Sequence, residues 1–161
     1  MDRLWAPWRM SYVSTAGAPG NACVFCAALS SGDDRQSLVL HRGERAFLVL
    51  NAYPYASGHL MAAVTRHVAG LDEASLDELA ECMRLVQIAV RALRAVYRPD
   101  GFNVGVNQGA VAGAGVAGHL HVHVVPRWNG DTSFMTAIGD TKVLPESLQD
   151  TYDRLSAALR T

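Results

Sequence analysis

Three histidines, His119, His121 and His123, alternate with apolar residues in the segment HLHVHVV. An alternation of period two predicts a β-strand, on which the three imidazoles project from one face while the intervening apolar side chains face the core. Their positions lie ~6.5 to 7 Å apart along the strand, at roughly 3.3 Å per residue. Because an imidazole is costly to bury without partners, this row indicates a functional site rather than packing.

Two chemistries can use such a row. A three-histidine metal centre requires nitrogens that converge to about 2.0 to 2.1 Å from one ion, and same-face residues of a straight strand diverge too far for that. Nucleophilic catalysis requires a neutral imidazole that attacks phosphorus and a neighbouring imidazolium that steadies the leaving oxygen. The spacing therefore favours nucleophilic catalysis.

The segment QGAVAGAGVAG, residues 108–118, directly precedes the histidine row. Its small residues permit positive φ angles and a close approach of the backbone to a ligand, which suits a phosphate-binding loop. A plain flexible connection between two strands is the alternative.

Cys23 and Cys26, in the segment CVFC, have the spacing of a zinc knuckle. A tetrahedral zinc site needs two further ligands from elsewhere in the chain. The alternatives are two free thiols, or a redox pair, for which the strand order lacks a thioredoxin-like setting. The third cysteine, Cys82, falls within a helical apolar stripe and is expected in the core.

Five strands and two helices are expected to position these residues. Short β-branched and aromatic runs predict strands at 37–42, 46–51, 59–64, 102–107 and 119–125. Ser75 and Glu78 form a capping-box pattern, followed by a helical stripe of Leu79, Met83, Val86, Val90, Leu93 and Tyr97. Pro99 and Gly101 end that helix, and a last helix follows Pro145. Short turns between strands predict an α+β fold: an antiparallel sheet with one long helix packed on it and a C-terminal helix.

The bulk composition is that of one globular domain. The chain has 161 residues, half of them apolar, and a formal net charge of -1, so it lacks the excess of basic residues of a protein that binds polymeric nucleic acid.

The N-terminal segment MDRLWAPWRM carries charges where a signal peptide has an apolar core, and no apolar run reaches membrane-spanning length. We therefore expect a cytoplasmic protein without a membrane partner.

The histidine row has the form His-x-His-x-His-x-x, with x apolar, and so resembles the motif of the histidine triad (HIT) superfamily. The segment LNAYPYASGHLMAAVTRHV is similar to the first block of that family, and FNVGVNQG to the strand before the triad. The resemblance covers most of the chain, from Leu38 to Trp128. LWAPWRM at the start and HVVPRWNGDTSFMTAIGDTKVLPESL at the end resemble its bacterial diadenosine tetraphosphate phosphorylase branch.

This resemblance implies a HIT-like fold in a single domain of residues 1–161. It divides the chain into an N-terminal arm with the CxxC (1–36), a HIT core (37–128) and a C-terminal extension (129–161). It also implies a homodimer or a larger homo-oligomer.

The resemblance also assigns the catalytic roles. His121 is expected to form a covalent nucleotidyl-histidine intermediate, which water, phosphate or another acceptor resolves. The nucleophile must be neutral, with its other ring nitrogen donating to a fixed acceptor. His123 is expected to donate to the leaving or bridging oxygen.

Further residues are expected to hold the nucleotide. Asn107 would offer its amide to the phosphates, and the loop glycines Gly113 and Gly115 would offer backbone amides. The loop departs from the family pattern, because residues 113–116 carry no hydroxyl or amide side chain. Asn51 matches the position that holds a ribose hydroxyl, with a turn role before Pro54 as the alternative. Trp128 is expected beside the base or a subunit boundary, or else as a buried aromatic.

For the metal, the resemblance supplies the two missing ligands. His67 and His119 match the positions that complete a Cys2His2 site with Cys23 and Cys26 in the zinc-bearing branches of the superfamily. Such a site would pin the N-terminal arm to the triad strand and leave His121 free. Mg²⁺ is expected only together with the polyphosphate substrate.

The resemblance implies an enzyme that cleaves dinucleoside polyphosphates such as diadenosine tetraphosphate, by phosphorolysis or hydrolysis. Two alternatives remain open. One is a purine nucleoside phosphoramidase that splits the P–N bond of AMP-linked amines with the same nucleophile. The other is a nucleotide-binding sensor or scaffold without turnover.

Overall fold

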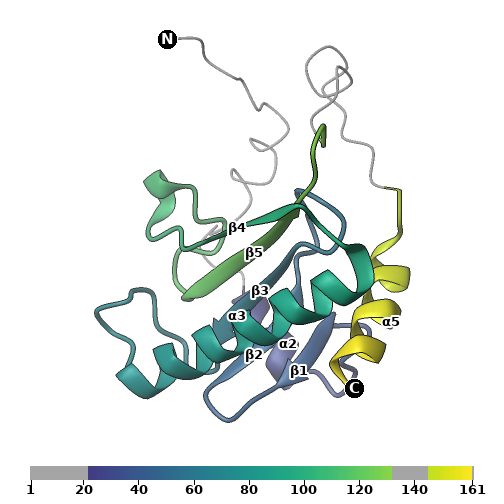
Figure 1. The fold of residues 1–161 in the computed structure, drawn as a ribbon. Coiled ribbons are helices and arrows are strands. Elements are labelled where there is room, and N and C mark those ends of the chain that lie inside the picture. Colours follow the sequence, from purple (N-terminus) through teal and green to yellow (C-terminus); the bar gives the residue numbers. More distant parts are fainter. Residues whose placement is uncertain (1–21, 132–144, 161) are drawn as a thin grey trace, which may run out of the picture.

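The computed structural model describes residues 22–131 and 145–160. The LWAPWRM part of the expected arm and residues 132–144 of the expected extension lie outside the described residues. The described elements, labelled as in Figure 1, are α2 (Val24–Ser30), β1 (Val39–Arg42), β2 (Ala46–Leu50), β3 (Leu60–Val64), α3 (Leu76–Tyr97), β4 (Gly101–Gly105), the 3-10 turn η1 (Ala110–Ala112), β5 (His121–Arg127) and α5 (Leu148–Leu159).

The five strands form one sheet in the order β1-β2-β3-β5-β4. Every neighbouring pair is antiparallel. Strands that are consecutive in the sequence therefore pair with each other, except that β5 lies between β3 and β4. In that central place His123 lies opposite Met61 on one side and Gly105 on the other. The expected α+β class with an antiparallel sheet is confirmed.

The long helix α3 begins at the capping box that its sequence predicts. The Ser75 hydroxyl accepts from the Glu78 backbone N–H at 3.2 Å, and the Glu78 carboxylate accepts from the Ser75 N–H at 2.7 Å. The helix ends at Arg98, which adopts the left-handed conformation with φ 48°. One member of the predicted stripe is wrong, because Met83 is 50% exposed. The buried face centres on Leu85 and Ala89, and a residue two positions from Leu85 is turned by about 200° around the helix.

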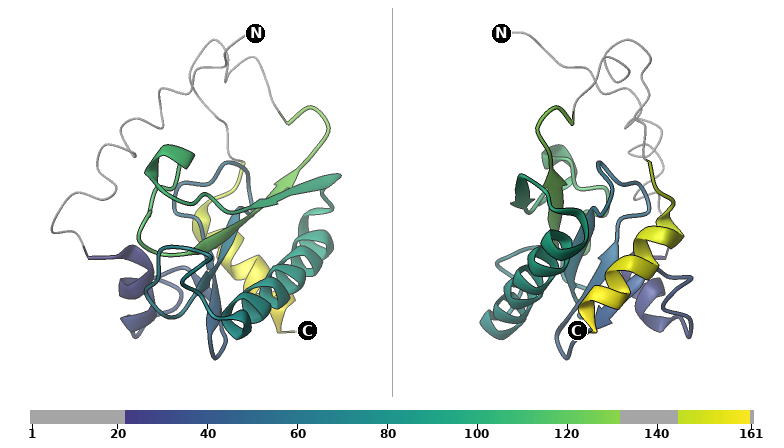
Figure 2. Two further views of the ribbon diagram at one scale, coloured as in Figure 1. Left: turned by 90° about the vertical axis from the view of Figure 1, so that its left-hand side faces the viewer. Right: turned by 45° about the vertical axis from the view of Figure 1, so that its right-hand side comes forward.

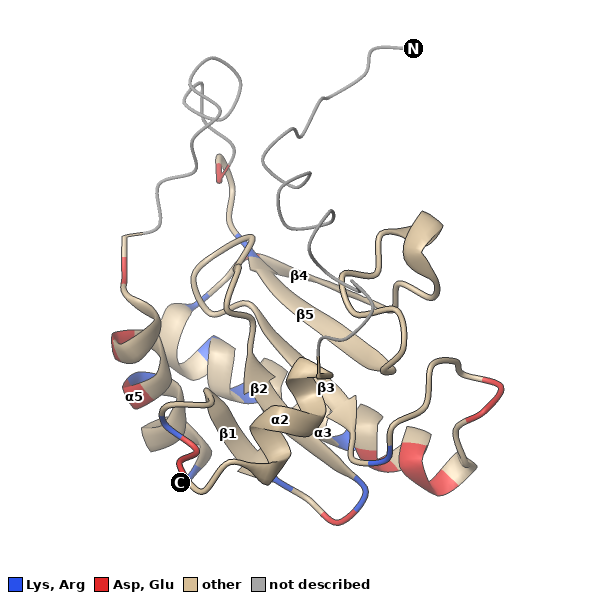
Figure 3. Ribbon diagram, turned by 180° about the vertical axis from the view of Figure 1, so that it is seen from behind, with Lys and Arg blue, Asp and Glu red and all other residues tan. Residues whose placement is uncertain are grey.

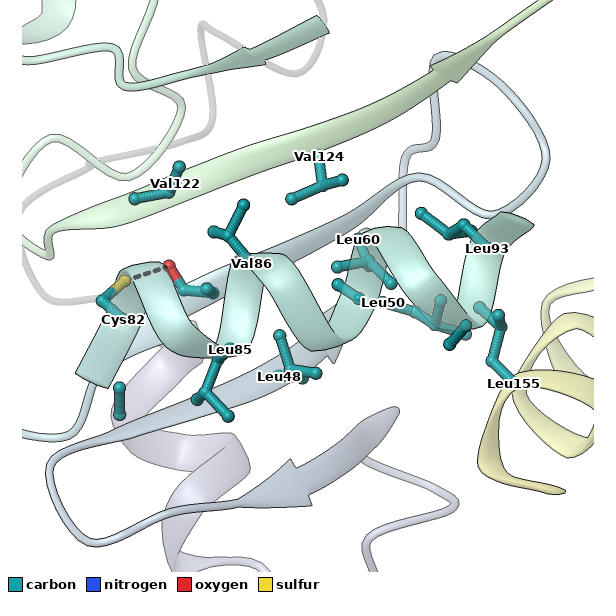
Figure 4. Packing of buried hydrophobic residues seen from close by; sticks show 14 residues of the cluster. Leu48, Leu50, Leu60, Cys82, Leu85, Val86, Leu93, Val122, Val124 and Leu155 are labelled. Atoms are coloured by element: carbon teal, nitrogen blue, oxygen red, sulfur yellow. Dashed lines mark hydrogen bonds between the residues drawn. The ribbon is translucent and has the colours of Figure 1, made fainter. Parts of the chain in front are cut away.

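The main core lies between α3 and one face of the sheet. Leu48, Leu60 and Val124 from three strands meet Leu85 and Leu93 from the helix, and each is fully buried (Figure 4). Cys82 also lies in this core, as expected, and is 2% exposed. Helix α5 packs beside α3 and against β1 (Figure 2). None of the described helices is both long and apolar enough to span a membrane.

The short helix α2 covers part of the opposite face of the sheet, over β1, β2 and β3 (Figure 3). The sequence did not predict this helix, which is seven residues long and has no side-chain hydrogen bond at its N-cap, Cys23. Its one fully buried residue, Phe25, packs with Phe47, Val49 and Met61. A helix this short depends on tertiary packing for its stability.

The strand boundaries differ slightly from the predicted ones around the glycine-rich loop. β4 ends at Gly105 rather than Asn107, and β5 begins at His121 rather than His119. His119 thus precedes the strand, and the ladder between β5 and β3 starts at His121 paired with Ala63. His121 and His123 therefore lie in β5, whereas His119 lies in the loop before it.

Candidate active site and metal centre

His121 and His123 project from the face of β5 that is opposite to α3. Val122 and Val124 point into the main core, and are 6% and 0% exposed. The two imidazole rings lie beside each other, with 4.9 Å between ring centroids and an angle of 78° between their planes. The alternation therefore places both rings on one face, as the sequence predicts.

The His121 ring is held in one tautomer by the backbone. Its Nδ1 lies 2.7 Å from the carbonyl oxygen of His119, and because a carbonyl can only accept, Nδ1 carries the proton. Nε2 then holds a lone pair. Burial lowers the pKa of His121, against the opposite effect of the hydrogen bond to His119. The side chain, 3% exposed and packed at 4.9 Å against Phe25, is thus a neutral imidazole at pH 7.

His123 is held in the other tautomer by His59. The Tyr55 backbone N–H donates to His59 Nδ1 at 3.1 Å, so the proton of His59 sits on Nε2. This Nε2 lies 3.0 Å from Nδ1 of His123, which must accept. His123 therefore carries its own proton on Nε2, where it can act as a donor.

The sequence analysis missed the role of His59. Its side chain is 1% exposed and lies on the sheet face that carries the triad. The signal that could have found it is a single polar residue directly before the apolar run of β3, since a buried imidazole needs partners.

His123 lines an open groove of about 350 Å³ along β4 and β5. Asn107 also lines this groove, and its amide donates to the Gly113 carbonyl at 3.4 Å. Gly113 has φ 90°, a left-handed conformation that favours glycine. Gly115 follows in the same loop and is half-buried. Asn107, the loop and His123 are thus brought together.

Asn51 lies at the end of β2, beside His59. Its side-chain oxygen accepts from the Tyr53 backbone N–H at 2.9 Å, which is the turn role that the sequence offered as an alternative. Its amide nitrogen lies 3.4 and 3.5 Å from the two ring nitrogens of His59.

Trp128 follows β5 and is anchored to the end of α3. Its indole N–H donates to the Tyr97 carbonyl at 3.3 Å, and the side chain is half-buried. It is not among the residues that line the groove at His123.

Cys23, Cys26, His67 and His119 converge at one point, as the sequence predicts. Their potential ligand atoms all lie within 4.8 Å of one another. Nδ1 of His119 is 3.3 Å from the Cys23 sulfur, and Nδ1 of His67 is 3.3 Å from the Cys26 sulfur. Helix α2 supplies the second cysteine and begins directly after the first.

The chemistry of these donors fits a soft divalent metal. Nε2 of His119 donates to the Val64 carbonyl at 2.7 Å, so its Nδ1 presents a lone pair to the sulfurs. Burial lowers the pKa of His119, which keeps this imidazole neutral. Burial and the neighbouring Cys23 raise the pKa of the Cys26 thiol, and a cation between the sulfurs would stabilise both thiolates. Two sulfurs and two imidazole nitrogens form the usual ligand set of a tetrahedral zinc site.

Comparison with known proteins agrees with this geometry. The HIT domain family matches residues 33–130. An AP-4-A phosphorylase of Mycobacterium tuberculosis is 44% identical over 160 residues, with 94% of this chain and 80% of that protein covered.

The chain is also similar in fold to solved structures of histidine triad proteins. A Zn-bound histidine triad family protein from Mycobacterium smegmatis is 28% identical, with a TM-score of 0.70, and the match covers 86% of this chain and 94% of that one. A hypothetical histidine triad nucleotide-binding protein from Sulfolobus tokodaii is 27% identical, with a TM-score of 0.65 and coverage of 86% and 89%.

Proposed function

Because the chain belongs to the HIT domain family, we propose that it cleaves dinucleoside polyphosphates such as diadenosine tetraphosphate through a nucleotidyl-histidine intermediate. The observation that carries this proposal is the pair of fixed tautomers. His121 presents a lone pair on Nε2, and the adjacent His123 presents a proton on Nε2. A nucleophile and a proton donor are thus set side by side.

In the first step, Nε2 of His121 attacks the α-phosphorus of the bound nucleotide. The P–N bond forms as the bond between that phosphorus and the bridging oxygen breaks. The leaving nucleotide takes the bonding electron pair, and the Nε2–H of His123 stabilises the charge on its oxygen by donating a hydrogen bond. In the second step, an oxygen of phosphate or water attacks the same phosphorus, and His121 leaves with the P–N electron pair.

Other residues are proposed to hold the nucleotide. The Asn107 amide and backbone N–H groups around Gly113 and Gly115 would bind the α-phosphate, and His123 lines the same groove. Asn51 is proposed to reach a ribose hydroxyl through its amide nitrogen, since its oxygen is engaged in the turn. For Trp128, a place beside the base or a subunit boundary remains a proposal.

We propose zinc as the metal held by Cys23, Cys26, His67 and His119. When bound, it would tie α2 to the segment before β5 and take no part in the chemical steps. Mg²⁺ is proposed to accompany the polyphosphate chain rather than a protein site.

We also propose a homodimer, or a larger assembly built from it, in the cytoplasm. A reducing compartment is consistent with the free thiols of Cys23, Cys26 and Cys82. Sedimentation of the purified protein as a monomer would contradict the dimer.

The central experiment is incubation with diadenosine tetraphosphate, with and without inorganic phosphate, followed by identification of the products. ADP plus ATP in the presence of phosphate would establish phosphorolysis, and AMP plus ATP would establish hydrolysis. Turnover of an AMP-amide but not of diadenosine tetraphosphate would favour the phosphoramidase. Binding of nucleotide without turnover of either substrate would favour the sensor or scaffold.

A further inference from the structure

The groove at His123 continues along β5 to Arg127. His121, His123 and Arg127 share one face of the strand, because the register with β4 is regular from Gly105 to Gly101. Arg127 lies four residues beyond His123, about 13 Å at roughly 3.3 Å per residue. Both side chains line the same groove.

The Arg127 guanidinium is fixed by two neighbours. Its Nε and Nη2 donate to the Asp131 carboxylate at 2.6 and 2.8 Å, and Nη1 donates to the Asn103 side-chain oxygen at 2.8 Å. Asp131 is itself held, because it also accepts from the Trp128 backbone N–H at 3.2 Å. These contacts lock the orientation of a side chain that would otherwise be mobile.

The fixed guanidinium keeps donors for a ligand. It has five N–H groups, of which the contacts above use three. The remaining two are on Nη1 and Nη2, at the tip of the fork, and this tip is the part of arginine that matches two oxygens of a phosphate. The Arg127 side chain is 46% exposed, so the tip is accessible.

The floor between His123 and Arg127 admits an anionic chain. No acidic residue occurs in β4 or β5, and the acidic residue on the turn after β5, Asp131, is paired with Arg127. Figure 3 shows other described Asp and Glu residues along α5 and at the start of α3. Gly105 faces open space, with no atom within 4 Å of where a Cβ would be. Uncharged residues therefore separate the proton donor from the arginine.

We propose that the stretch of this groove from His123 to Arg127 is the subsite for the leaving part of the substrate, in which Arg127 binds the distal phosphates of a polyphosphate chain. The inference rests on the proposed function, because the proposed mechanism has the leaving oxygen accept a hydrogen bond from His123. The subsite would select polyphosphates over substrates with a small neutral leaving group, such as AMP-amides.

The test compares two substrates in one variant. In Arg127→Gln, kcat/KM for diadenosine tetraphosphate should fall roughly ten- to a hundredfold relative to kcat/KM for an AMP-amide, since hydrogen bonds to a charged phosphate are lost. Equal losses on both substrates would overturn the proposal. Arg127→Lys retains the charge but not the fork, so its loss should be intermediate, and melting curves identify any variant that fails to fold.

Arg35→Gln is the matched control. Arg35 forms a bidentate pair with Asp153 at 3.0 and 2.8 Å, as Arg127 does with Asp131, but it lies outside the groove. The ratio of the two kcat/KM values should be unchanged in this variant. The same loss in Arg35→Gln would show that breaking a surface ion pair is the cause.

A binding measurement separates this proposal from the proposed function. Titration with inorganic tripolyphosphate should give a dissociation constant at least about tenfold higher for Arg127→Gln than for the unmodified chain. If the enzyme cleaves no dinucleotide, the proposed function fails, while this titration still decides whether the groove binds polyphosphate. Equal affinity in both proteins, or none in either, would refute the subsite.

Discussion

His121 and His123 are identical side chains two residues apart, and their surroundings give them opposite tautomers. The tautomer of each ring is set by the partner of its Nδ1, which is a carbonyl oxygen for His121 and an imidazole N–H for His123. One ring can therefore attack while the other donates. Neither assignment depends on the side chain's own chemistry, since free imidazole adopts both tautomers.

At the residue scale, His121→Ala should abolish cleavage and retain nucleotide binding, because it deletes the attacking atom and leaves Asn107 and the loop amides in place. His123→Ala should be less severe, since a proton donor is typically worth ~10²- to 10⁴-fold. Enzyme denatured at alkaline pH during turnover should carry nucleotide mass on the peptide that contains His121. Full activity in His121→Ala, or an adduct on another residue, would contradict the mechanism.

His59 offers a second test at this scale. In His59→Phe, Nδ1 of His123 loses its donor, so the protonated Nε2 is no longer enforced and proton donation weakens. We expect kcat to fall about tenfold or more on a substrate whose leaving group needs a proton. A nucleotide ester with a good leaving group should lose much less. A uniform loss on both substrates would indicate a purely structural role for His59.

At the scale of elements, α2 joins the metal ligands to the catalytic face. Phe25, between the two cysteines, packs at 5.1 Å from the His119 ring and 4.9 Å from the His121 ring. The other end of the helix is held by Arg42 of β1, whose guanidinium donates to the carbonyls of Leu29 at 2.7 Å and Ala28 at 3.3 Å. The position of α2 thus rests on the Cys2His2 cluster and Phe25 near its start and on Arg42 at its end.

Cys23→Ser should lower the thermal stability of the protein more than its intrinsic turnover, because a thiolate-bound structural metal contributes to folding. Zinc content by mass spectrometry should fall in parallel with the melting temperature. Cys82→Ala is the control: it removes a buried thiol outside the cluster and should leave the zinc content unchanged. A metal-free and fully stable preparation of the unmodified chain would refute the zinc assignment.

At the scale of the whole molecule, the sheet has a different layer on each face. One face is sealed by α3 through the main core, and the other carries α2, the metal cluster and the groove. The larger hydrophobic core therefore lies on the first face, and the candidate catalytic residues lie on the second. The start of α3 is tied to the segment after β3 by Arg66 and Glu78.

That tie makes the free energy of unfolding depend on pH. Hydrogen bonds from Arg66 and from the Ser75 backbone lower the pKa of Glu78 to about 2, against 4.5 for the unperturbed group. Because the folded pKa is lowered, the stabilisation is fully present above pH 4.5 and is lost as the pH falls toward 2. Glu78→Gln retains the capping-box pattern but loses the charge that pairs with Arg66, so it should lower the melting temperature at pH 7 modestly.

The difference in melting temperature between the two proteins should shrink as the pH falls from 4.5 toward 2. Metal loss at acidic pH affects both proteins and cancels in this difference. If the difference in melting temperature stays constant over this range, the charge of Glu78 does not contribute to the stability of the protein.

The sequence by itself determined the features that depend on local pattern. Period-two alternation determined that His121 and His123 share a face, and the Ser75 capping box determined where α3 begins, since both follow from backbone geometry between near neighbours. The resemblance of the motifs indicated the four metal ligands and Asn107. Only the tertiary structure decided the relay from Tyr55 through His59 to His123, the helix at the CVFC segment and the place of Arg127 at the far end of the groove. These join residues from different strands and loops, and no local periodicity encodes which strands become neighbours in the sheet.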